Sequence, residues 1–149
     1  MESSTPARIL VVAHRTAATP ALLAAVRERA SRGPAEFTLL VPSAAHGLDR
    51  LAEPDPVGTE AKDTLDLALP LLEEAAGGHV EGMVGTAQPL DAVTDAVNQH
   101  GFDEIIISTL SPRVSRWLHM DVPNRLRILG KPITTVSAKG AGAPAQTGA

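Results

Sequence analysis

The sequence has no cysteine and very few aromatic residues. Without cysteine, the 149-residue chain has no disulfide framework, no thiolate zinc site and no catalytic thiol. Aromatic residues make up 2% of the chain, whereas hydrophobic residues make up 44%. The core must therefore consist of valine, leucine, isoleucine and alanine, which suits a parallel sheet with helices on both faces.

Targeting and membrane-spanning segments are also missing from the pattern. Residues 1–6 contain neither a basic region nor an apolar region of the kind that begins a signal peptide. No apolar run approaches the ~20 residues of a membrane span. We therefore expect a cytoplasmic protein with no membrane partner. Because the net charge is −4, we expect no nucleic-acid partner either.

The charges are unevenly distributed along the chain. Between Glu53 and Glu104 there are twelve acidic residues and one basic residue, Lys62. From residue 105 onward the only acid is Asp121, and there are six bases: Arg113, Arg116, Arg125, Arg127, Lys131 and Lys139. This uneven distribution of charge could steer an anionic ligand to the basic end of the protein, or it could reflect only helices that expose their charges unevenly.

Five short apolar runs alternate with helical patterns. The runs predict strands at 8–13, 36–41, 79–84, 103–107 and 132–136. The first helix is predicted to begin at Thr19-Pro20 and to end at Gly33, and Pro70 should kink or split a second helix over 60–76. Further helices are predicted at 89–99, after Ser111-Pro112 and over 121–129. This order predicts one α/β domain over 1–138, with an open five-stranded parallel sheet, and a disordered Gly/Ala/Pro-rich tail over 139–149.

Polar residues gather after the first and fourth predicted strands. In open α/β sheets, ligands bind at the carboxyl ends of the strands, where the strand order reverses. The segment after strand four combines hydroxyl and guanidinium groups at a helix start, which suits an anion such as phosphate. The alternative is that Ser111 only caps a helix and that Arg113 and Arg116 are solvated. The candidate ligand-binding residues are Ala13, His14, Arg15, Thr16, Val41, Ser108, Thr109, Ser111, Arg113, Ser115 and Arg116.

Catalytic and metal-binding patterns are not visible. The sequence has no Gly-x-Ser-x-Gly elbow, Walker loop or Gly-x-Gly-x-x-Gly fingerprint. No two of its five histidines are spaced at i, i+4, and none joins an acid in a recognised metal pattern. We therefore predict no metal site, no catalytic residues and no enzymatic activity. Trp117, the only tryptophan, is interpreted as a packing residue of the core or of a dimer.

Several segments, in this order, resemble the universal stress protein family. They are the first strand with its short loop, Leu39 to Pro42, Val80 to Gly85 before a helix that begins with proline, Phe102 to Ile107, and Gly130 to Val136. The resemblance runs from Arg8 to about Ser137. It implies a Rossmann-like fold of the adenine-nucleotide α-hydrolase type with strand order 3-2-1-4-5. It also implies a homodimer that forms through the edge strand over 132–136.

The chain most resembles a bacterial subgroup of this family. Its marks are Val-Val-Ala-His-Arg-Thr, at 11–16, and Ser-Thr-Leu-x-Pro-x-x-Ser-Arg-Trp-Leu, at 108–118. ATP-binding members have Gly-x-x-Gly after strand four, and Ser108 and Ser111 stand at these glycine positions. His14 replaces the acid that commonly ends strand one, and the third glycine position falls near 119–121. These changes argue against ATP or AMP as a cofactor bound in the usual mode.

Three functions are consistent with these observations. The first is a non-enzymatic, stress-protein-like regulator or small-ligand binder with an altered nucleotide site. The second is an enzyme or binder that acts on a phosphorylated or adenylated small molecule through residues 108–116. The third is a purely structural, partner-binding homodimer.

Overall fold

A computed structural model of the chain describes residues 6–13, 17–42, 59–85, 89–109 and 125–137. The elements in chain order are β1 (Ala7–Val12), α1 (Pro20–Ser31), β2 (Ala35–Pro42), α2 (Thr59–Ala76), β3 (Val80–Gly85), α3 (Pro89–His100), β4 (Glu104–Thr109), the 3₁₀ turn η2 (Leu126–Leu129) and β5 (Ile133–Ser137). The helix predicted after Ser111-Pro112, the start of the one predicted over 121–129 and the tail over 139–149 lie outside these residues. No helix within the described ranges is long and apolar enough to span a bilayer.

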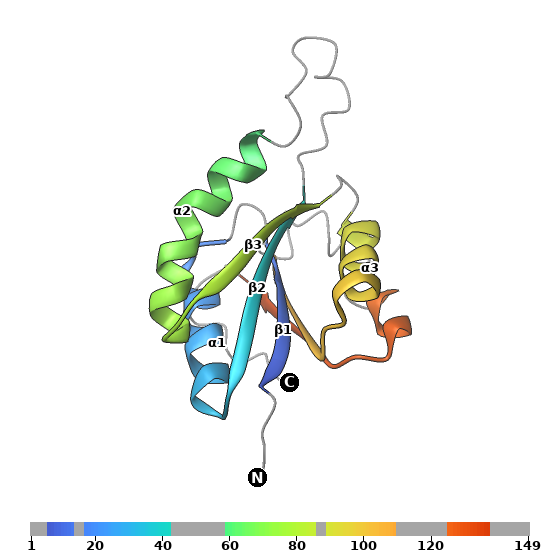
Figure 1. The fold of residues 1–149 in the computed structure, drawn as a ribbon, viewed down its shortest axis with the longest axis horizontal. Helices are drawn as coiled ribbons and strands as arrows, with labels where there is room; N and C mark the ends of the chain where they lie inside the picture. Colours follow the sequence, from blue (N-terminus) through green and yellow to red (C-terminus); the bar gives the residue numbers. More distant parts are fainter. Residues whose placement is uncertain (1–5, 14–16, 43–58, 86–88, 110–124, 138–149) are drawn as a thin grey trace.

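The five strands form one parallel sheet in the order β3-β2-β1-β4-β5 (Figure 1). All four strand pairs are parallel, and β1 lies between β2 and β4. The α/β fold class and the strand order 3-2-1-4-5 are therefore confirmed. Each crossover must carry a connecting segment over a face of the sheet, as the alternation of apolar runs and helical patterns predicts.

Both faces of the central strands β1, β2 and β4 are buried, which explains why these strands are continuous apolar runs. Ile9 and Val11 face the layer that contains α1 and α2, and the cluster there includes Leu22, Val26, Leu65 and Leu72. Leu10 and Val12 face the other layer, with Val93 and Ala96 of α3 and Leu126 of η2. A strand that is covered on both sides has no solvent-facing position to fill with a polar residue.

Local signals explain where the helices begin and end. The Thr19 hydroxyl accepts a hydrogen bond from the Leu22 backbone N–H at 3.4 Å, and Pro20 occupies the start of α1. The turn η2 ends at Gly130, whose φ of 75° is left-handed. Both ends agree with the sequence prediction.

Pro70 does not split α2, which runs as one helix through the proline. Pro70 lies on the exposed side of α2. It cannot donate to the carbonyl of Asp66, four residues earlier, which is also exposed. Because water can reach this side of the helix, the lost backbone hydrogen bond does not force a break.

Candidate functional site

The sheet reverses its strand order beside β1. From β1 the chain moves to β2 and β3 on one side, and then returns to place β4 and β5 on the other. In the β1/β4 register Val12 pairs with Ile107, so Ala13 and Ser108 come next, at the carboxyl ends of adjacent strands. This reversal is where open α/β sheets bind ligands.

We call the group of Ala13, Val41, Ser108 and Thr109 the switch-point edge. Ala13 and Val41 are fully buried, with 0% of their surface exposed. The Ala13 N–H donates to the Leu40 carbonyl at 3.2 Å and so continues the β1/β2 ladder by one residue. These two residues provide a closely packed apolar support for the edge and contribute no reactive group.

Ser108 and Thr109 bring hydroxyl groups to this edge. Their exposed fractions are 1% and 2%, and they are the only buried polar side chains among the described residues. The Thr109 hydroxyl lies 3.5 Å from the Val136 carbonyl, to which it donates at the limit of hydrogen-bond length. Because a buried hydroxyl must be hydrogen-bonded to offset its loss of water, the two hydroxyls make this end of the isoleucine run a polar point in an otherwise apolar layer.

The first turn of α1 faces the same edge, because the helix follows the carboxyl end of β1. The start of a helix carries partial positive charge from its free N–H groups. Thr19 satisfies one of these groups, because its hydroxyl accepts from the Leu22 N–H. The edge thus combines buried hydroxyls with a positive helix end, an arrangement that favours an anion over a cation.

The structure brings together four of the predicted site residues: Ala13, Val41, Ser108 and Thr109. Of the remaining predicted site residues, all fall outside the described ranges: His14, Arg15, Thr16, Ser111, Arg113, Ser115 and Arg116.

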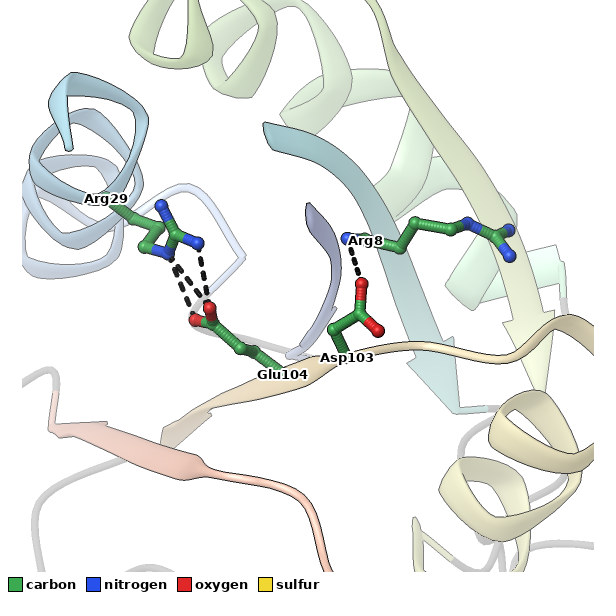
Figure 2. A network of polar contacts seen from close by, with 4 residues as sticks. All are labelled: Arg8, Arg29, Asp103 and Glu104. Atoms are coloured by element: carbon green, nitrogen blue, oxygen red, sulfur yellow. Dashed lines mark hydrogen bonds and ion pairs between the residues drawn. The ribbon is translucent and has the colours of Figure 1, made fainter. Parts of the chain in front are cut away.

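At the opposite end of β4, Arg29 and Glu104 form a bidentate ion pair (Figure 2). Arg29 Nη2 donates to Glu104 Oε2 at 2.8 Å, and Nε donates to Oε1 at 3.0 Å. The hydrogen bonds from Arg29 lower the pKa of Glu104, and those to Glu104 raise the pKa of Arg29. The pair ties α1 to the amino end of β4, far from the switch-point edge.

Arg8 closes the same end of the sheet (Figure 2). Its backbone N–H donates to Asp103 Oδ2 at 2.9 Å, and the Asp103 N–H donates to the Arg8 carbonyl at 2.7 Å. Its guanidinium donates to the carbonyls of His100 and Gly101 and lies 5.2 Å from the centroid of the Phe102 ring. Sequence reasoning missed these partners because they lie more than 90 residues from Arg8.

His79, the third group with a shifted pKa, joins α2 to β3. Its Nε2 lies 2.9 Å from Glu81 Oε2, and its Nδ1 lies 3.1 Å from Glu73 Oε2. The hydrogen bond to Glu81, with the charge of both carboxylates, raises the pKa of His79. In the described part of the chain, each resolved pKa shift thus has an ion pair as its cause, and no group of three histidine or acidic side chains is placed to hold a metal.

No family model matches the sequence, and no curated protein matches it significantly. Solved structures do match the fold. A universal stress protein in complex with cAMP has a TM-score of 0.63 and 12% identity, over 91% of this chain and 100% of that one. UspA of Lactobacillus plantarum has a TM-score of 0.58 and 21% identity, over 91% of this chain and 99% of that one.

A universal stress protein of Archaeoglobus fulgidus in complex with dAMP matches with a TM-score of 0.56 and 19% identity, over 89% of this chain and 98% of that one. These matches cover nearly the whole of each protein. The chain therefore has the fold of the universal stress proteins, as the resemblance in the sequence implied.

Proposed function

We propose that this chain is a member of the universal stress protein family that acts in the cytoplasm as a non-catalytic regulator and binds a small anionic ligand at the switch-point edge. The observation that carries the proposal is the pair of buried hydroxyls, Ser108 and Thr109, at the reversal of strand order. A hydroxyl at this place can donate to a phosphate or carboxylate oxygen.

The similar structures support the class of ligand. Two of them hold an adenine nucleotide, cAMP in one and dAMP in the other. Both ligands contain a phosphate, which suits the hydroxyls and the positive start of α1. We propose that this chain takes a small ligand of the same kind, a nucleoside monophosphate or another small phosphate ester.

The proposed mode of binding differs from that of ATP-binding members. Ser108 stands where those members have the first glycine of the loop. Its side chain is buried, so its Cβ and hydroxyl occupy volume that a glycine would leave for the phosphates. We therefore propose that recognition relies on the hydroxyls and that a triphosphate binds more weakly than a monophosphate.

The non-catalytic role is supported by where the perturbed pKa values lie. Catalytic acids and bases commonly have shifted pKa values within a cleft. Here Arg29, Glu104 and His79 are shifted by ion pairs at the amino end of β4 and between α2 and β3. Each of these groups holds two elements together, and none lies at the switch-point edge.

Isothermal titration calorimetry with AMP, cAMP and ATP tests this proposal. We expect the monophosphates to bind and Ser108→Ala to weaken them about 10-fold or more, because a hydrogen bond to a charged group contributes about 1.5–3 kcal/mol. Ser31→Ala is the matched control, since it removes an exposed hydroxyl that donates only to the Glu28 carbonyl.

Three results would contradict the proposal. Stoichiometric ATP carried through purification would overturn the altered mode of binding. Turnover of any of the three nucleotides would overturn the non-catalytic role. Equal affinity in Ser108→Ala and the wild type, with unchanged circular dichroism, would remove Ser108 from the site.

A second function, that of a homodimer, is favoured by the exposed edge strand β5. This strand pairs only with β4 in the sheet, and Thr134 and Thr135 are exposed. Its sequence, Ile-Thr-Thr-Val-Ser, has no charge or proline that would discourage pairing with another strand. We propose that two copies pair along this edge.

A further inference from the structure

An acidic patch with exposed leucines lies on the outer side of α2. We define it by Asp63, Asp66, Leu67, Leu71 and Glu74, which are all exposed. Lys62 lies beside it and pairs with Asp66 at 3.6 Å, so the patch keeps an excess of acidic residues. Leu67 is 74% exposed and Leu71 is 41% exposed, although leucines of the same helix such as Leu72 are buried. Asp63, Leu67 and Leu71 follow one another at i, i+4 spacing and therefore form one stripe along the helix.

A basic patch with an exposed isoleucine lies on η2. It consists of Arg125, Arg127, Ile128 and Lys131, and Ile128 is 88% exposed. The turn is held in place by its neighbour Leu126, which is buried against the α3 layer. No acidic residue occurs between Arg125 and Ser137, so nothing in this stretch neutralises the three positive charges.

The two patches lie on opposite faces of the sheet. The buried side of α2 belongs to the apolar cluster of α1 and α2, whereas Leu126 belongs to the cluster of α3. Figure 1 shows α2 and α3 on opposite sides of the sheet. Within one molecule the sheet separates them. The acidic patch of one molecule can therefore meet a basic patch only on another molecule.

We propose that the acidic patch on α2 binds the basic patch on η2 of a second copy of this chain, in a head-to-tail contact. Opposite charges orient the two surfaces, and Leu67 and Leu71 bury themselves against Ile128. In such a pair one molecule keeps its basic patch free and the other keeps its acidic patch free. The contact is therefore heterologous, and it extends to a ring or a chain of molecules rather than stopping at two.

The association is expected to be weak and sensitive to salt. Each patch contains only four or five residues, whereas stable interfaces involve about 20–30 residues on each side. Charges at their rims are screened beyond about 10 Å in 0.1 M salt. The contact should therefore be visible at high protein concentration and low ionic strength, and should disappear as salt is added.

Charge reversal provides the test, with sedimentation velocity of the full chain as the readout. One variant carries Asp63→Arg and Asp66→Arg, and the other carries Arg125→Glu and Arg127→Glu. In each variant both patches have the same sign, so we expect self-association to weaken about 10-fold or more relative to the wild type. In a 1:1 mixture the unreversed basic patch of the first variant meets the unreversed acidic patch of the second, and the two reversed patches also have opposite signs, so association should return.

The matched control for the first variant is Glu28→Arg with Asp95→Arg, which makes the same change of net charge as Asp63→Arg with Asp66→Arg at exposed positions on α1 and α3. It should associate like the wild type. All proteins carry Thr135→Lys, so that pairing through β5 does not contribute to the measured mass.

Recovery of large species in the mixture, and in neither variant alone, supports the proposal. Three outcomes overturn it. The first is no rise in mass with concentration for the protein with unreversed patches, and the second is reversed variants that associate as strongly as that protein does. The third is a mixture whose mass stays as low as that of its components while circular dichroism shows that both are folded. Ile128→Ser, which keeps every charge, should also weaken the association and would contradict the apolar contact if it did not.

Discussion

Single residues matter most in this molecule where two elements approach each other closely. A Cβ built at Gly85, the last residue of β3, would lie 2.8 Å from the Ala92 Cβ on α3 and 2.9 Å from Leu40 Cδ1. At Gly78, before the same strand, a Cβ would meet nothing within 4 Å. Packing therefore requires a glycine at position 85, at the carboxyl end of β3, but not at position 78, before the strand begins.

We predict that Gly85→Ala destabilises the protein by about 1–3 kcal/mol, because α3 must move away from the sheet to admit the methyl group. Gly78→Ala should change the free energy of unfolding by less than about 0.5 kcal/mol. Urea unfolding of the two variants and the wild type measures both values. Equal stability of Gly85→Ala and the wild type would show that α3 does not pack this closely.

The Arg29–Glu104 pair is the second residue-scale feature, and it contributes stability that depends on pH. Glu104→Gln should lower the free energy of unfolding by about 1 kcal/mol at neutral pH, since the pair is bidentate but Glu104 remains 30% exposed and is screened by water. Because the folded pKa of Glu104 lies below its ordinary value of 4.5, this contribution is complete above about pH 4.5. It is lost as the pH falls through the folded pKa.

Urea unfolding of Glu104→Gln and the wild type from neutral pH to below about pH 4 checks this prediction. Asp66→Asn is the control, because it breaks the exposed Lys62–Asp66 pair at 3.6 Å and should have little effect. A stability difference for Glu104→Gln that did not shrink in acid would show that hydrogen-bond geometry rather than charge holds α1 to β4.

At the scale of elements, His79 connects the end of α2 to the start of β3. Glu73 on α2 accepts from the Val80 backbone N–H at 3.2 Å and also lies beside the His79 ring, while Glu81 holds the other ring nitrogen. The junction therefore combines a backbone contact with a charge that depends on the protonation of one exposed histidine.

We predict that His79→Gln lowers the melting temperature in mild acid and leaves it unchanged in base. The pKa of His79 is raised above its ordinary value of 6.5, so its stabilising charge is complete below about pH 6.5 and is lost as the pH rises through the folded pKa. Melting curves of the wild type, His79→Gln and the control His100→Gln across this range test the prediction. A difference that persisted at high pH would refute the electrostatic explanation.

At the scale of the whole molecule, the sheet ends in two different edge strands. The β3 strand carries an exposed charged side chain, Glu81, which discourages pairing with another strand. Every residue of β5 is at least partly exposed, and the strand has no charged side chain. The molecule is thus asymmetric, with a charged side chain on one edge strand and none on the other.

We predict that the wild-type protein dimerises through β5 and that Thr135→Lys makes it monomeric. A charged side chain on an edge strand opposes pairing with a second copy. Light scattering at a salt concentration high enough to suppress charge-driven contacts gives the mass of each protein, and Thr94→Lys, on α3, is the control. A dimer that survived Thr135→Lys would place the interface elsewhere.

The sequence by itself determined the features that depend on local physical chemistry. Apolar runs specified buried strands, their alternation with helical patterns specified a parallel sheet, and Thr19-Pro20 and Gly130 specified helix ends, because these signals act over a few residues. The order of strand ends also predicted that Ala13 and Ser108 lie at one edge. The split predicted as one alternative at Pro70 was wrong, since exposure to water lets α2 continue through the proline.

Only the tertiary structure decided which distant residues meet. Glu104 lies 75 residues from Arg29, and no local pattern pairs them; the sheet does so by placing β4 beside β1 under α1. The same holds for the packing of Gly85 against α3, the burial of the Thr109 hydroxyl beside β5, and the placement of acidic and basic patches on opposite faces. Each depends on how the crossovers stack the elements, which is a property of the whole fold.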